Sequence, residues 1–151
     1  MIYDPTLATD PAAWRAADEH ARLRAIEDYH HRAALKMPNV RMHAVIHNVV
    51  ENQLAEGLPE ALAAMERLLG AGLSRHDVLH AIGSVVAGQI HTMLSGQAPA
   101  DEGDYARRLQ ALDPAAWRGS AEKEQPRRAR PTPQPGPGLT LPPPRRPRRR
   151  H

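Results

Sequence analysis

The chain has 151 residues, which suits one domain with one hydrophobic core. It contains no cysteine, which excludes disulfides and thiolate metal sites, and no phenylalanine, so the core must be mainly aliphatic. No apolar stretch approaches 18 residues and no signal-peptide pattern is visible, so we expect a soluble, cytoplasmic protein without a membrane span.

The net charge of +3 is unevenly distributed along the chain. Residues 126–151 contain eight arginines and no acidic residue, which leaves 12 basic and 17 acidic side chains, a net charge of −5, on the first 125 residues. We therefore expect a mildly acidic helical domain over residues 1–118 and a disordered, basic, proline-rich tail over residues 119–151.

The helical signals predict an all-α fold, a small four- to five-helix bundle. Asp10 before Pro11 is a good helix start, and one long helix is expected from Pro11 to about Lys36. A second, from about Val40 to Glu56, has apolar residues at helical spacing and stops at Gly57.

Three further segments complete the predicted bundle: Pro59 to Leu69, Ser74 (as cap) to Leu94, and a shorter one from Asp101 to Leu112. The hexapeptide D-P-A-A-W-R occurs at residues 10–15 and again at residues 113–118. We interpret both copies as helix starts and not as a duplicated domain. Short loops between the helices favour antiparallel neighbours.

Paired histidines mark two of the predicted helices. His43, His47 and Glu51 follow one another at intervals of four, and so do His76 and His80. Side chains four apart lie on one face of a helix, where two imidazoles can bind one metal ion. Each pair lies on the same flank of its helix's apolar arc, at the edge of the buried face. Packing through these arcs would bring the pairs into one partly buried pocket.

Further residues extend this set. Glu27 and His30 have the spacing of helical di-iron sites, and His91 lies on the same helix as His80. Gly83 would let another helix approach closely. The predicted metal ligands are His30, His43, His47, Glu51, His76 and His80. Without thiols such a set suits zinc, iron, manganese or nickel, with zinc or iron preferred here.

Two other interpretations of the histidines stay open. They could form a polar network in a metal-free adaptor or dimerisation module, or a cluster that responds to pH. If a metal were catalytic, bound water would be the nucleophile, with Glu51 or Asp77 as base. The motifs of phosphate-binding loops, nucleophile elbows and zinc proteases are absent, so these chemistries have no support.

Two segments of the chain resemble an uncharacterised bacterial family known as a domain of unknown function. They are H-A-V-I-H-N-V-V-E-N-Q-L-A at residues 43–55 and G-L-S-R-H-D-V-L-H-A-I-G-S-V-V at residues 72–86. The resemblance extends over residues 12–95, including D-Y-H at residues 28–30, and leaves the tail outside. It implies a domain boundary but no reaction.

Two better-known families are similar in part. Hemerythrin-like bundles have H-x3-E and H-x3-H helices, as in His47 with Glu51 and His76 with His80, but their closing H-x4-D helix is missing. L-H-A-I-G at residues 79–83 is similar to the L-H-D-I-G of HD-type phosphohydrolases. Ala81 stands where that family has its essential aspartate.

The tail has nine prolines and eight arginines in residues 126–151, a composition that does not favour a folded core. Its last arginines form a compact positive cluster, which would attract nucleic acid or anionic surfaces without sequence specificity. The alternative is a solubilising extension without a partner. Self-association of the helical domain is a further expectation.

Overall fold

The computed structural model describes residues 1–33, 39–98, 101 and 103–121, and over these residues the fold is all-α, as predicted. The described residues contain seven helices packed together and no strand. The helices are α1 (Pro11–Ala16), α2 (Glu19–Arg32), α3 (Val40–Ala55), α4 (Pro59–Gly70), α5 (Arg75–Leu94), α6 (Asp104–Gln110) and α7 (Pro114–Trp117).

The predicted helix over residues 11–36 is wrong in one respect, because two helices, α1 and α2, occupy this segment. Asp10 caps α1, as expected. Ala17 is then extended, and the carboxylate of Asp18 accepts hydrogen bonds from the backbone N–H groups of His20 and Ala21, which starts α2. A side-chain cap stabilises a new helix start, so the chain turns here. Residues 34–36 lie outside the described residues.

Most of the other predicted helix starts are confirmed. Asn39 caps α3 and Ser74 caps α5 through hydrogen bonds to backbone N–H groups. Asp113 in the second hexapeptide accepts a hydrogen bond from the N–H of Ala115 and begins the short helix α7. Both hexapeptides are therefore helix starts. Helix α6 begins at Asp104, three residues later than predicted.

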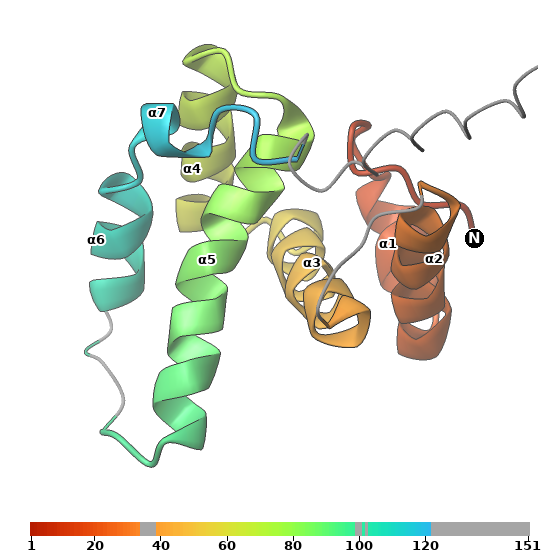
Figure 1. Ribbon diagram of the computed structural model, residues 1–151, viewed down its shortest axis with the longest axis horizontal. Coiled ribbons are helices and arrows are strands. Elements are labelled where there is room, and N and C mark those ends of the chain that lie inside the picture. Colours follow the sequence, from red (N-terminus) through yellow and green to blue (C-terminus); the bar gives the residue numbers. More distant parts are fainter. Residues whose placement is uncertain (34–38, 99–100, 102, 122–151) are drawn as a thin grey trace, which may run out of the picture.

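Helix α3 lies between two groups of helices (Figure 1). On one side, α1, α2 and the segment before them form a hydrophobic cluster around Tyr3, Trp14 and Ile26. On the other, α4, α5 and α6 form a second cluster that includes Leu68 and Ile82. Because α3 contributes residues to both clusters, it holds α2 and α5 in place relative to each other.

Helices α3 and α5 approach closely at Gly83, as the sequence predicted. A Cβ atom built on Gly83 would lie 2.7 Å from Cγ2 of Ile46 in α3. No real Cβ atom keeps such a contact, so glycine is required for this packing distance. The close approach brings the histidines of α5 near those of α3.

Residues 119–121, just after the predicted boundary at residue 118, contact α5. The backbone N–H groups of Gly119 and Ala121 and the hydroxyl of Ser120 all donate to the carboxylate of Asp77 in α5. The predicted tail from residue 122 lies outside the described residues. Within the described part, no helix has the length and apolar character needed to cross a membrane.

Candidate metal centre

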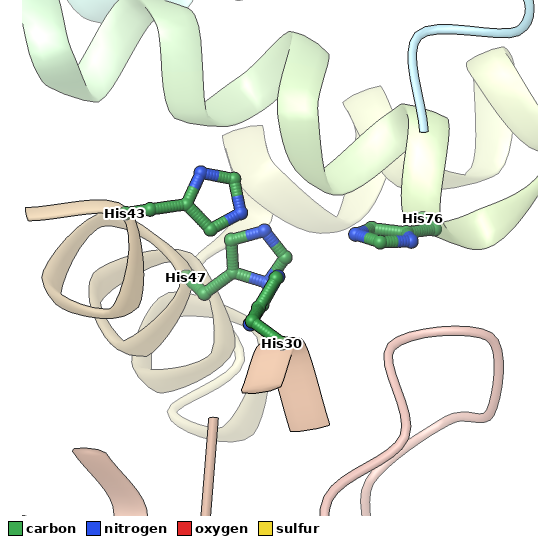
Figure 2. A group of neighbouring side chains, drawn as sticks. All are labelled: His30, His43, His47 and His76. Carbon is green, nitrogen blue, oxygen red and sulfur yellow. The ribbon is translucent and has the colours of Figure 1, made fainter. Parts of the chain in front are cut away.

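Four histidines meet where α2, α3 and α5 come together. Each of His30, His43, His47 and His76 offers a ring nitrogen, and these nitrogens all lie within 4.8 Å of one another. Figure 2 shows the four imidazoles converging from the three helices. Three of the side chains are buried and that of His43 is half-buried. The predicted convergence of the two histidine pairs is therefore present.

His80 lies beside this group and extends it to five imidazoles. Its ring centroid is 4.5 Å from that of His76, 5.3 Å from His43 and 5.4 Å from His47. The ring of His47 contacts all four others at centroid distances between 4.4 and 5.4 Å. His47 is thus the central residue of the cluster.

The face of α3 that carries these side chains is more buried than its apolar pattern suggests. We expected His47 and Glu51 at the edge of the buried face, but they are 1% and 0% exposed, whereas the apolar Met42 is 40% exposed. The reason is that α3 packs against neighbours on two sides. Its apolar residues pack into both hydrophobic clusters, and its histidines contact both α2 and α5.

The proton position on His30 follows from its hydrogen bond. Its Nδ1 lies 2.7 Å from the carbonyl oxygen of Ile26, one turn earlier in α2. A carbonyl oxygen can only accept, so Nδ1 carries the proton. In the neutral ring the lone pair then lies on Nε2, which is buried. A lone pair on nitrogen is what a metal ion requires.

Tyr3 holds His47 in the same tautomer, with the proton on Nδ1. The Tyr3 hydroxyl oxygen lies 3.0 Å from Nδ1 of His47 and 3.0 Å from Oε1 of Glu51. The carboxylate of Glu51 already accepts from Arg75, and the phenol donates to it as well. Burial, followed by the charge of Glu51, raises the pKa of Tyr3 well above its ordinary value. The Nδ1 of His47 must therefore donate to Tyr3.

His80 has an equivalent arrangement at the other end of the folded chain. The Ser120 hydroxyl oxygen lies 3.0 Å from Oδ1 of Asp77 and 3.2 Å from Nδ1 of His80. By the same reasoning Ser120 donates to Asp77 and accepts from His80. Burial raises the pKa of Asp77, but hydrogen bonds from Ala121, Gly119 and Ser120 outweigh it and lower that pKa overall, so this carboxylate is ionised.

Glu51 was predicted as a metal ligand, but its carboxylate is not part of the group of converging imidazoles. Arg75 donates to both carboxylate oxygens, at 2.9 and 2.8 Å, and Tyr3 and Thr9 each donate to one of them. Four donors fill the lone pairs of this fully buried carboxylate. It balances the charge of Arg75 and anchors Tyr3.

The imidazoles resist protonation in this environment. Burial is the main cause, followed by repulsion from the neighbouring histidines, and together they lower the pKa of His43 and of His76 to about 3. The same causes place the pKa of the fully buried His47 well below its ordinary value. These rings are therefore neutral near pH 7, the state in which histidine binds metals.

Two other candidates lie apart from the cluster. Glu27 forms an ion pair with Arg41 at 2.9 Å, and His91 is exposed near the end of α5. Tyr3, Arg75 and Ser120 were missed by sequence reasoning. No spacing marks them, because Tyr3 and Ser120 lie outside the predicted helices, and Arg75 differs in no visible way from a surface arginine.

Comparisons of the chain with protein families, with curated proteins and with solved structures found no match. The similarity to an uncharacterised bacterial family, and the partial likenesses to hemerythrin-like bundles and HD-type phosphohydrolases, therefore stay predictions.

Proposed function

We propose that this chain is an all-helical metal-binding protein. More specifically, it binds a divalent transition-metal ion, with zinc and iron as the leading candidates, through His30, His43, His47 and His76. The observation that carries the proposal is the meeting of four imidazole nitrogens within 4.8 Å of one another in a buried position. His80 stands close enough to serve as a fifth ligand.

The spacing of the nitrogens supports this proposal. Zinc–imidazole bonds of about 2.05 Å place tetrahedral ligand nitrogens about 3.3 Å apart. Separations of up to 4.8 Å would thus close by roughly 1.5 Å at most, through small rotations of the rings.

The hydrogen bonds of the histidines also support metal binding. His30, His47 and His80 each donate through Nδ1, so each has its lone pair on Nε2. Metal-binding histidines commonly donate their other ring nitrogen to a carbonyl or carboxylate in this way. With thiolates absent, an imidazole set of this kind suits zinc or iron.

The test is elemental analysis of protein purified without an affinity tag. We expect close to one metal ion per chain, and we expect His47→Gln to lose it because His47 is the central ring. His31→Gln is the matched control, since His31 is exposed on the same helix as His30. A wild-type chain that stays folded and metal-free after exposure to zinc and ferrous iron would contradict the proposal and favour a polar network.

A further inference from the structure

Two chains of hydrogen bonds with the same chemistry lead to the histidine cluster. In each, a buried carboxylate accepts from a hydroxyl, and that hydroxyl accepts from Nδ1 of a histidine. One runs from Glu51 through Tyr3 to His47, and the other from Asp77 through Ser120 to His80. Tyr3 precedes α1 and Ser120 follows α7, so segments at both ends of the described structure reach the same cluster.

Both carboxylates are fixed in place independently of the histidines. Arg75 binds Glu51 through two hydrogen bonds and also donates to the carbonyl oxygen of Pro5, in the N-terminal segment. The backbone N–H groups of Gly119 and Ala121 bind Asp77. Each hydroxyl therefore has a rigid acceptor for its single proton, and only its oxygen remains to face the imidazole.

We propose that Tyr3 and Ser120 are positioning residues of the metal site, each fixing the orientation and proton position of one histidine. This inference rests on the proposed function. Each hydroxyl accepts from Nδ1 of its histidine and so places the proton on Nδ1 and the lone pair on Nε2. Each also connects its histidine to a carboxylate, which makes the imidazole a better donor to a dication.

The arrangement makes metal binding and the docking of both chain ends interdependent. A metal that binds His47 and His80 favours the ring orientations that Tyr3 and Ser120 require. By linkage, docking of the end segments must favour the metal to the same extent. Removal of the metal should therefore increase hydrogen exchange at the amides of Gly119 and Ala121, which donate to Asp77.

The first test measures zinc affinity of the full chain by competition with a chelator. We expect Tyr3→Phe and Ser120→Ala each to weaken zinc binding by about 10- to 100-fold, as loss of an outer hydrogen-bond partner does at other sites. Ser120→Thr keeps a hydroxyl and should recover most of the affinity. Tyr105→Phe is the matched control, because Tyr105 also has a hydroxyl in a side-chain hydrogen bond, to Gln53, away from the cluster.

The second test reads the proton positions directly by nitrogen NMR of the metal-free protein. We expect His47 and His80 to carry the proton on Nδ1, and we expect Tyr3→Phe to shift His47 alone toward the other tautomer. Ser120→Ala should likewise shift His80 alone. A merely structural role for the hydroxyls would leave both tautomers unchanged.

The outcomes separate the two proposals. Wild-type zinc binding with unchanged affinity and unchanged tautomers in both variants would overturn the positioning role and leave the metal site standing. Absence of zinc binding by the wild-type chain would overturn the proposed function and the positioning role together. Weakened binding with shifted tautomers supports both.

Discussion

Glu51 shows at the scale of one residue what spacing can and cannot predict. Its interval of four from His47 correctly places both side chains on one flank of α3. Its partners come from elsewhere: Arg75 begins α5 and Tyr3 precedes α1. Four donors surround its carboxylate, so Glu51 lies outside the four-histidine group and instead holds Arg75 and Tyr3 in place.

Removing the Glu51 carboxylate should lower the stability of the fold. Glu51→Ala leaves Arg75 with its charge largely buried and uncompensated, for which we expect a loss of about 3–5 kcal/mol in the free energy of unfolding. Urea denaturation of the metal-free protein measures it. Glu56→Ala at the exposed end of α3 is the control and should change stability by less than about 0.5 kcal/mol. Equal effects of the two substitutions would contradict this role.

The histidines could be predicted from the sequence because their pairing is local. Two imidazoles four residues apart share a helix face whatever the rest of the fold does, and both pairs show this spacing. Tyr3 and Ser120 could not be predicted in this way. Their positions depend on end segments that dock through hydrogen bonds to Glu51 and Asp77, and no periodic pattern records such contacts.

At the scale of the helix, local capping signals predicted most boundaries correctly. Ser74 and Asp113 start helices as expected, and α3 begins at Val40 as predicted. The division between α1 and α2 was missed because the residues around Asp18 are also compatible with one continuous helix. The burial of α3 was misjudged for another reason. Amphipathicity predicts one buried face, but α3 packs on two sides and buries its polar face as well.

The contact between Gly83 and Ile46 sets the separation of α3 and α5 and can be tested by a double-mutant cycle. Gly83→Ala gains up to about 1 kcal/mol of helix propensity, but its Cβ would meet the stiff, branched side chain of Ile46 at 2.7 Å. We expect a net destabilisation on the order of 1 kcal/mol in the wild-type background.

In an Ile46→Ala background the same glycine substitution should instead stabilise the protein, because the opposing methyl group is gone. Thermal denaturation of the four proteins gives the coupling energy between the two positions. Additive effects would show that the close approach does not constrain the two helices. A lower zinc affinity of Gly83→Ala would connect this contact to the site.

At the scale of the whole molecule, the cluster joins parts of the fold that are otherwise held by separate hydrophobic contacts. His30 belongs to the side of α1 and α2, His76 and His80 belong to α5, and α3 with His47 lies between them. A shared metal ion would tie these parts together at their junction. Tyr3 and Ser120, from the two end segments, hold the opposite ring nitrogens of His47 and His80.

X-ray absorption spectroscopy at the zinc edge on the zinc-loaded full chain tests the proposed metal site most directly. We expect four or five nitrogen neighbours at about 2.0–2.1 Å with the multiple-scattering pattern of imidazole, and no carboxylate of Glu51 bound to the zinc. A shell made mainly of oxygen, or fewer than three imidazoles per zinc, would contradict it.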